Sequence, residues 1–424
     1  MEVKPGHKQT EVGVIPEEWD VSLIGQQCQI FGRIGFRGYT VDDIVEEGSG
    51  AIAINPSNVQ DGKTIFDKCT YISWHKYEES PEIKIHEGDI ILVKTGSTFG
   101  KTAMVKNLPG KATLNPQVIV FKKIKGSRGF FGYMMGFPTI QKQITAAVVG
   151  GALPTLSQKL VAAFKMPLPR TLPEQRAIAT ALSDVDGLLG GLDRLIAKKR
   201  DLKQAAMQQL FTGQTRLPGF HGEWEVKRLE QSCELITKGT TPTSLGRNFT
   251  ESGVNFLKAE SLSENGETIP DKVAFIDAAT HKLLKRSQLK AGDLLISIAG
   301  VLGRVGRVSL GVLPANTNQA LAIVRLGNAS ELDRNFLFYC LLSPMTAKQI
   351  SDVNVQAAQA NISLQNVRDL KIHVPPTIPE QTAIAEVLTE MDGELSALEQ
   401  LREKTRALKQ AMMQELLTGR TRLI

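Results

Sequence analysis

Residues 172–217 and 378–423 are two copies of one segment, and this duplication constrains the fold more than any other feature of the sequence. LPEQRAIATALSDVDGLLGGLDRLIAKKRDLKQAAMQQLFTGQTRL aligns without gaps with IPEQTAIAEVLTEMDGELSALEQLREKTRALKQAMMQELLTGRTRL at a constant offset (378 − 172 = 206). From Pro173 to Leu217, 26 of 45 positions are identical, which chance does not produce. Internal repeats indicate a tandem architecture. The chain therefore consists of a variable domain, a duplicated segment, a second variable domain and the second copy of the duplicated segment.

The segments upstream of each copy match more weakly. PEEWDVSLI around Trp19 resembles HGEWEVKRL around Trp224, and EGDIILVKTGSTFGKTAMV (87–105) resembles AGDLLISIAGVLGRVGRV (291–308). The stretch KTGSTFGKT looks like a phosphate-binding loop, but it has three residues between its glycines where that motif has four. The second copy lacks the Lys-Thr pair altogether. Two apolar runs around a glycine-rich turn instead predict a β-hairpin with a basic residue at its tip in each half.

The duplicated segments are predicted to be long helices. Pro173 and Pro379, each followed by Glu, suit a helix first turn, and Gly213 and Gly419 suit its end. Apolar residues at steps of three and four, with charges between them, are typical of a coiled-coil seam. The predicted seam residues are Ile178, Leu182, Val185, Leu189, Leu192, Leu195 and Leu202 in the first copy, and Ile384, Leu388, Met391, Leu395, Leu398, Leu401, Leu408 and Met412 in the second.

A helix of about 38 residues spans roughly 57 Å. We expect the two helices to pair antiparallel, giving two heads separated by a rod with pseudo-two-fold symmetry. The alternative is two amphipathic helices, each packed on its own domain. The fold class is α+β, with mixed and antiparallel β-structure in the heads. The expected boundaries are 1–171 for the first head, 172–217 for the first helix, 218–377 for the second head and 378–424 for the second helix.

Composition and charge narrow the function. The net charge is +6, but residues 1–87 carry 8 Lys/Arg against 15 Asp/Glu, whereas residues 88–170 carry 12 against one, Asp89. Such a basic block is typical of a polyanion-binding face or of a solvated surface. No apolar run is long enough for a membrane span, and no signal peptide is visible, so we expect a cytoplasmic protein without a membrane partner. The four cysteines lack metal-site spacing and are expected to be buried, reduced thiols.

The order and spacing of these features resemble the specificity subunits of Type I restriction–modification enzymes, over nearly the whole chain. The resemblance rests on the entries at Trp19 and Trp224, the two hairpins, and the paired PEQ…AIA…L helices ending LFTG and LLTG. It implies two target-recognition domains that each read half of a split, asymmetric double-stranded DNA site. The helices would then act as a ruler and dock two methyltransferase subunits, and restriction and translocase subunits could join that assembly.

Loops of the heads are expected to contact the DNA. Arg, Lys, Asn, Gln, Ser and Thr side chains read base edges and phosphates, and GRIGFRGYT and TKGTTPTSLGR are glycine-rich, basic groups of this kind. A single residue of this kind is more often a turn or surface residue than a DNA contact, so the two groups are stronger candidates than their members. The candidates are Arg33, Arg37, Ser97, Thr98, Lys101, Asn115 and Gln117 in the first head, and Lys238, Thr240, Arg247, Lys258, Arg304, Arg307, Asn318 and Gln319 in the second.

The sequence shows no catalytic motif. The only Pro-Pro, in VPPT (374–377), is not the Asn/Asp-Pro-Pro-aromatic site of adenine methyltransferases, and neither a glycine-rich cofactor loop nor a metal-ligand cluster is visible. We therefore expect a non-catalytic chain without its own cofactor or metal. By resemblance, S-adenosylmethionine, ATP and Mg would bind only to partner subunits. Two alternatives stay open: an autonomous DNA-binding protein that recruits no enzyme, and an enzyme whose active site has no recognisable motif.

Overall fold

The computed structural model describes residues 5–33, 37–60, 62–96, 98–147, 155–328, 330–354 and 361–423. The chain divides into two units. Unit 1 comprises residues 1–192 with 401–424, and unit 2 comprises residues 193–400. Each unit contains one β-rich head and parts of two long helices, so neither unit is formed by one continuous half of the repeat.

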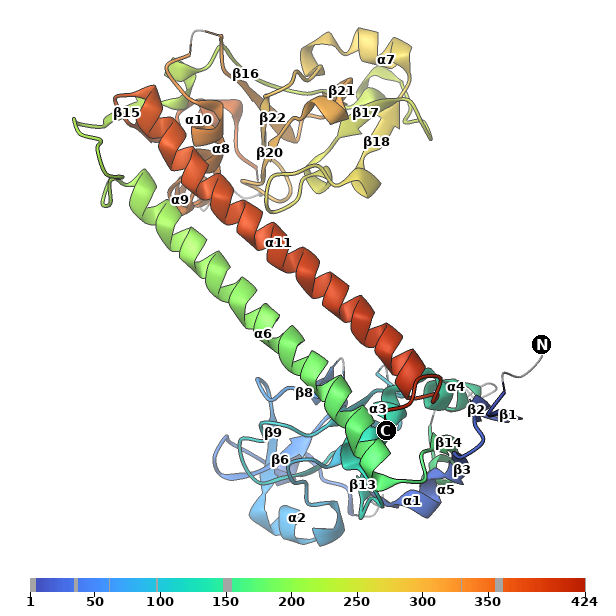
Figure 1. The fold of residues 1–424 in the computed structure, drawn as a ribbon. Coiled ribbons are helices and arrows are strands. Elements are labelled where there is room, and N and C mark those ends of the chain that lie inside the picture. Colours follow the sequence, from blue (N-terminus) through green and yellow to red (C-terminus); the bar gives the residue numbers. More distant parts are fainter. Residues whose placement is uncertain are drawn as a thin grey trace. The chain divides into compact units, whose positions relative to one another are not determined.

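The two long helices are confirmed. Helix α6 covers Leu172–Phe211 and α11 covers Ile378–Leu416 (Figure 1). In each helix the second residue is the proline that pre-sets the first turn. Two residues after α6, Gly213 adopts a left-handed φ of 69°, and three residues after α11, Gly419 adopts 70°. These are the glycines that the sequence placed at the helix ends.

The head of unit 1 is built on a six-stranded sheet of order β4-β13-β10-β11-β8-β7 and a four-stranded sheet of order β12-β6-β9-β5. The first sheet uses β4 (Gln29–Gly32), β13 (Val118–Lys122), β10 (Ile90–Val93), β11 (Thr102–Met104), β8 (Lys63–Thr64) and β7 (Val59–Gln60). The second uses β12 (Ala112–Leu114), β6 (Gly50–Ile54), β9 (Thr70–Ser73) and β5 (Ile44–Val45). Two small pairs complete it: β1 (His7–Thr10) with β2 (Gly13–Pro16), and β3 (Asp20–Leu23) with β14 (Lys165–Leu168).

The head of unit 2 repeats the central part of this topology. Its four-stranded sheet has the order β16-β22-β19-β20, and a three-stranded sheet has the order β18-β17-β21. The strands are β16 (Leu235–Lys238), β22 (Leu321–Arg325), β19 (Leu294–Ser297), β20 (Val305–Arg307), β18 (Ala274–Ile276), β17 (Val254–Leu257) and β21 (Ala315–Thr317). As β3 pairs with β14, so β15 (Glu225–Arg228) pairs with β23 (Lys371–Val374).

Both predicted hairpins are confirmed. Strands β10 and β11 pair antiparallel in unit 1, and β19 and β20 pair antiparallel in unit 2. In both units the first strand of the hairpin also pairs antiparallel with the strand that follows the hairpin, β13 or β22. KTGSTFGKT is therefore the turn of a sheet hairpin and does not lead from a strand into a helix, as a phosphate-binding loop does.

Short helices cover the sheets and pack on the long helices. Unit 1 has α1 (Ile24–Gln27), α2 (Trp74–Glu78), α3 (Arg128–Gly136), α4 (Pro138–Ala146) and α5 (Gln158–Ala162). Unit 2 has α7 (Ala278–Leu283), α8 (Arg334–Leu342), α9 (Pro344–Asn354) and α10 (Leu364–Arg368). Within the described residues, neither the long helices nor these short ones combine the length and apolarity needed to cross a bilayer.

Equivalent clusters hold the helix ends to each head. In unit 1, the indole of Trp19 donates to Glu174 of α6 at 3.3 Å, and Arg422 pairs with Glu174 and with Glu18. In unit 2, Trp224 donates to Glu380 of α11 at 3.3 Å, and Arg216 pairs with Glu380 at 2.7 Å. The two clusters differ in whether the segment that closes them is covalently continuous with the head.

In unit 2, the residues between Phe211 and Trp224 form one continuous loop. In unit 1, residues 417–423 close on Pro16 and Trp19 without a covalent link, and a side chain on Gly419 would lie 2.5 Å from Pro16.

The predicted seam is only partly correct. Ile178, Leu182, Leu189, Leu192, Ile384, Leu388 and Leu395 are buried, and Val185, Met391, Leu398 and Met412 are half-buried. Four predicted seam residues are exposed, and for these the prediction is wrong: Leu195 (41% exposed), Leu202 (49%), Leu401 (48%) and Leu408 (55%).

The error has a geometric cause. With 3.6 residues per turn, the buried face of α6 continues from Leu192 to Ile196, which is 2% exposed, and not to Leu195. Further along, this face carries charge: Lys199 pairs with Glu394 and Lys203 with Asp392, each at 2.5 Å. Because these pairs run in opposite order along the two helices, α6 and α11 are antiparallel in unit 2. In unit 1, Glu174–Arg422 and Asp186–Lys409 give the same direction.

The cysteines differ in environment. Cys28 and Cys340 are buried and Cys69 and Cys233 are half-buried, all as free thiols. Burial raises the pKa of Cys28, Cys233 and Cys340 to about 12. Because the thiolate is the reactive form, we expect iodoacetamide at pH 8 to modify Cys69 first, as followed by mass spectrometry. In denaturant all four should react alike, and equally fast labelling of Cys340 in the native protein would contradict the expectation.

Candidate nucleic-acid interface

In unit 1, the β12–β13 loop meets the turn of the β10–β11 hairpin. The backbone N–H of Lys94 donates to the carbonyl of Gln117 at 2.8 Å, which joins the β10–β11 hairpin to the β12–β13 loop. Gly96 adopts φ 104°, and a side chain there would approach the Gln117 amide at 3.4 Å. Lys101 and Gln117 are exposed beside this junction, and Thr98 is half-buried. Ser97 lies outside the described residues.

A polar network supports these loops from behind. Asn115 donates from its amide to the Tyr39 hydroxyl and to Asn55 Oδ1, both at 2.7 Å, and its Oδ1 accepts from the Gln117 N–H at 2.8 Å. Asn55 in turn donates to Thr70 at 2.9 Å. Burial raises the pKa of Tyr39, so the hydroxyl keeps its proton. Asn115 therefore fixes the shape of the loop through bonds within the head.

Arg33 has a supporting position. It is 3% exposed; its Nε donates to the carbonyl of Leu114 at 2.9 Å and its Nη2 to Thr113 at 3.0 Å. Its third bond, at 3.1 Å, goes to the carbonyl of Arg37 and so connects that residue to β12 through Arg33. Burial lowers the pKa of Arg33. Arg37 is half-buried and lies 3.7 Å from Glu82. Among the first-head candidates that the structure describes, Lys101 and Gln117 are thus the exposed ones.

Unit 2 brings together the equivalent loops. Ile298 N–H donates to the carbonyl of Ala320 at 2.8 Å, which joins the hairpin to the β21–β22 loop as Lys94 and Gln117 do in unit 1. Thr240 N–H donates to the carbonyl of Thr317 at 3.2 Å, and Arg286 donates to the Thr240 hydroxyl at 3.1 Å. The close contact between Thr240 and Thr317 requires a glycine at position 239, since a side chain on Gly239 would lie 2.0 Å from the Thr317 carbonyl.

The second-head candidates also separate into supporting and exposed residues. Arg304 donates to the carbonyls of Leu262 at 3.1 Å and Ala259 at 3.3 Å, and Arg307 donates to Asn335 at 2.7 Å. Lys258 lies 4.7 Å from the Phe249 ring centre. Asn318 Oδ1 accepts from the N–H of Ala320 in its own loop, and Gln319 Oε1 accepts from the N–H of Thr241 in the neighbouring loop. Lys238 and Arg247 are exposed, and so are Arg307 and Gln319 although they make these contacts. DNA contact by any candidate stays a prediction.

The basic block of residues 88–170 is partly neutralised. Lys122 pairs with Asp89, Lys165 with Glu11 at 2.7 Å, and Arg170 with Asp20 at 2.9 Å. The pKa of Glu11 and of Asp20 is lowered chiefly by the hydrogen bonds from Lys165 and Arg170. The other exposed cations of the block are Lys101, Lys106, Lys111, Lys123, Lys125, Arg128, Lys142 and Lys159. Part of the charge asymmetry seen in the sequence is thus internal pairing within one head.

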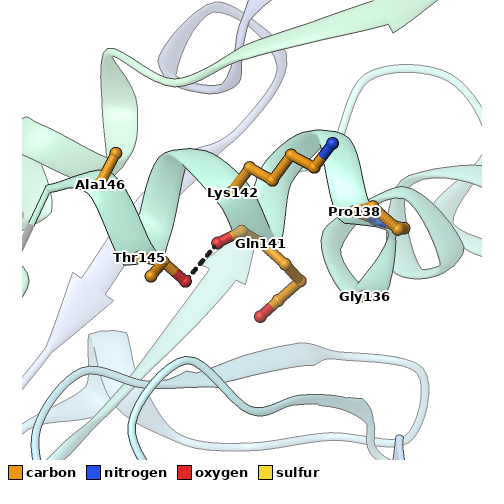
Figure 2. Close-up of a pocket in the computed structure, with 6 residues that line it drawn as sticks. All are labelled: Gly136, Pro138, Gln141, Lys142, Thr145 and Ala146. Carbon is orange, nitrogen blue, oxygen red and sulfur yellow. Dashed lines mark hydrogen bonds between the residues drawn. The ribbon is translucent and has the colours of Figure 1, made fainter.

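A shallow pocket of about 460 Å³ lies on α4, lined by Gly136, Pro138, Gln141, Lys142, Thr145 and Ala146 (Figure 2). Gln141 donates from its amide to the carbonyl of Gly100 at 3.1 Å, so α4 supports the hairpin turn. Lys142 is the only ionisable residue of the lining. The residues that the structure describes contain no cluster of three or more His, Cys, Asp or Glu side chains able to hold a metal ion.

Sequence reasoning missed several residues that shape these loops. Tyr39, Asn55 and Arg286 are ordinary polar residues in the sequence, and their importance depends on partners 46–76 positions away. It also missed Tyr133 and Tyr339, which bond to the long helices. Those two could have been found, since they stand at the offset of the repeat (339 − 133 = 206), in RGFFGY and RNFLFY.

The two heads share their central topology, and each carries a loop cluster and packs on the long helices. These features define an internally duplicated, two-headed protein. The family model for the Type I restriction modification DNA specificity domain matches residues 16–196 and 221–409. The chain belongs to this family, and it is a specificity subunit of the Type I restriction–modification class.

Relatives match along nearly the full length. The MjaVIII specificity subunit of Methanocaldococcus jannaschii is 25% identical over 96% of this chain and 94% of its own. The MjaX specificity subunit from the same organism, a Type I enzyme subunit described as putative, is 26% identical over 98% and 96%. The crystal structure of the S subunit from M. genitalium has a TM-score of 0.58 at 15% identity, covering 98% of both chains, and shares the fold.

Proposed function

We propose that this chain reads a split, asymmetric double-stranded DNA site, one half with each head, and docks two adenine-N6 methyltransferase subunits. The observation that carries the proposal is the pair of heads with the same central strand order but different loop residues. Equivalent scaffolds with unequal loops suit two half-sites of different sequence. The segment between the half-sites would be contacted through phosphates only, hence without base preference.

Docking of partner subunits is supported by a second stripe on the long helices, facing away from the buried side. On α6 it contains Leu195, Lys198 and Leu202, and on α11 the equivalent Leu401, Lys404 and Leu408, all exposed. Residues seven apart lie nearly on one helix face. Such a stripe suits an amphipathic partner helix, with the leucines as apolar contacts and the lysine beside an acidic residue. Two equivalent stripes suit two copies of one partner.

The chemistry would belong to the partners. An adenine must leave the base stack to be methylated, and the pocket for that base, S-adenosylmethionine and the ATP and Mg of restriction or translocase subunits are assigned here to other chains. The role of this chain is binding and placement: the exposed loop cations contact phosphates, the loop amides and guanidiniums contact bases, and the helices hold the enzymes at fixed positions along the DNA.

The test is to sequence modified bases in the host genome with and without this gene. We expect N6-methyladenine to disappear from one split motif when the gene is deleted and to return when it is restored. An unchanged methylome, with the chain shown to be expressed, would contradict the modification role. Tight, specific DNA binding by the isolated chain together with an unchanged methylome would favour the autonomous DNA-binding protein.

A further inference from the structure

Each unit contains a trio of tyrosine, aspartate and lysine from three different elements. In unit 1, the Tyr133 hydroxyl of α3 donates to Asp186 Oδ2 of α6 at 2.7 Å, and Lys409 of α11 pairs with Asp186 Oδ1 at 2.7 Å. The Lys409 Nζ also lies 5.6 Å from the Tyr133 ring centre. One carboxylate therefore connects the head to both long helices.

Unit 2 repeats the trio atom for atom. Tyr339 of α8 donates to Asp392 Oδ2 of α11 at 2.8 Å, Lys203 of α6 pairs with Asp392 Oδ1 at 2.5 Å, and Lys203 Nζ lies 5.3 Å from the Tyr339 ring centre. All three positions keep the offset of the repeat, since 339 − 133, 392 − 186 and 409 − 203 each equal 206. The trio has thus been kept in both heads, although most of their loop residues differ.

The trios contribute more to orientation than to stability. The side chains of Asp186 and Lys409 are 25% and 24% exposed, and partly exposed ion pairs add little to stability. The apolar residues around them already hold the head to the helices, as with Ile178 and Leu182 in unit 1. The trio instead restricts the orientation of the head relative to the helices, because charge-assisted bonds of this length are strongly angle-dependent. Burial and the nearby carboxylate raise the pKa of both tyrosines, so each remains a donor at neutral pH.

We propose that the two trios are positioning devices that fix the angle between each head and the paired helices, and so set the length of the gap between the two half-sites. The inference rests on the proposed function. Helix geometry gives the size of the expected displacement: about 20 residues of helix form a lever of roughly 30 Å. A rotation of roughly 6° at its base moves the far end by about 3 Å, close to the base-pair rise of about 3.4 Å.

The experiment uses the complex of the full chain with its methyltransferase partner. A panel of duplexes carries the same two half-sites with the gap lengthened or shortened by one or two base pairs, and kcat/KM for methylation is measured on each. We expect Tyr133→Phe and Asp186→Asn to reduce discrimination between the best gap and its neighbours by about tenfold. Tyr339→Phe should do the same, and the double Tyr133→Phe, Tyr339→Phe variant more strongly. Discrimination against altered half-site bases should not change.

The matched control is Tyr71→Phe, which removes an exposed hydroxyl bonded to Glu47 at 3.0 Å within one head. It should keep the wild-type gap profile. If the trio variants also keep that profile, or lose activity equally on every gap with lowered thermal stability, the trios are merely structural and the inference is overturned. If the wild-type complex methylates no split site, the proposed function fails instead, and this inference with it.

Discussion

Replacing Leu401 and Leu408 by aspartate, together with Leu195 and Leu202, is expected to abolish assembly with the methyltransferase subunits while leaving the isolated chain folded. All four side chains are 41–55% exposed, so the substitutions create no buried charge in the free chain. In a complex they would place carboxylates in an apolar contact. At about 2 kcal/mol for each central interface residue, the two changes on one helix lower affinity by about a thousandfold.

The assembly prediction separates the two equivalent stripes. Changing only Leu401 and Leu408 should leave a complex with one partner subunit, and changing all four should leave none, as measured by analytical ultracentrifugation. Leu310→Asp is the control, because Leu310 is 79% exposed and lies outside the long helices. A fourfold variant that still binds two partner subunits would show that docking uses another surface.

Removing residues 417–424 is expected to unfold much of unit 1 and to spare unit 2. The truncation deletes Leu417, whose side chain is fully buried in the unit 1 core, and Arg422, the partner of buried Glu174. Leu417→Ala alone should lower the free energy of unfolding by about 2–5 kcal/mol. Leu408→Ala, on the exposed face of α11, should change it by about 0.5 kcal/mol or less.

Hydrogen exchange distinguishes the two units in this experiment. After truncation, amides of residues 172–192 should lose protection, whereas those of β19 and β22 should keep theirs. Protection lost equally in both units would mean that they unfold as one, and unchanged protection in residues 172–192 would mean that the tail contributes little. Either result would contradict the expected role of residues 417–423 as the closing segment of unit 1.

The sequence was informative where a pattern is local. The repeat, the first-turn prolines and the terminal glycines predicted both long helices, and the apolar runs predicted both hairpins. The predicted seam is wrong after Leu192 because leucines seven apart suggested a contact face. The face towards the other long helix instead continues through Ile196 to the ion-paired Lys199 and Lys203. From sequence, an exposed leucine stripe and a buried one look the same.

The recognition loops were harder to interpret. A basic residue in a glycine-rich loop suggested exposure, yet Arg33 is buried because the carbonyl of Leu114 and the hydroxyl of Thr113, about 80 positions away, receive its donors. The parallel pairing of β12 with β6 that brings Asn115 to Asn55 is equally non-local. Which loop residues face outwards depends on such long-range contacts, and a single sequence does not encode them in any visible spacing.

The closure of unit 1 by residues 401–423 has a consequence for synthesis on the ribosome. Residues 193–400, which make up unit 2, are all translated before residues 401–424 of unit 1. The first head is made first, but its core is complete only when Leu416 and Leu417 have been added. A nascent chain that stops before residue 416 therefore carries a first head with an incomplete core, although all of unit 2 is already made.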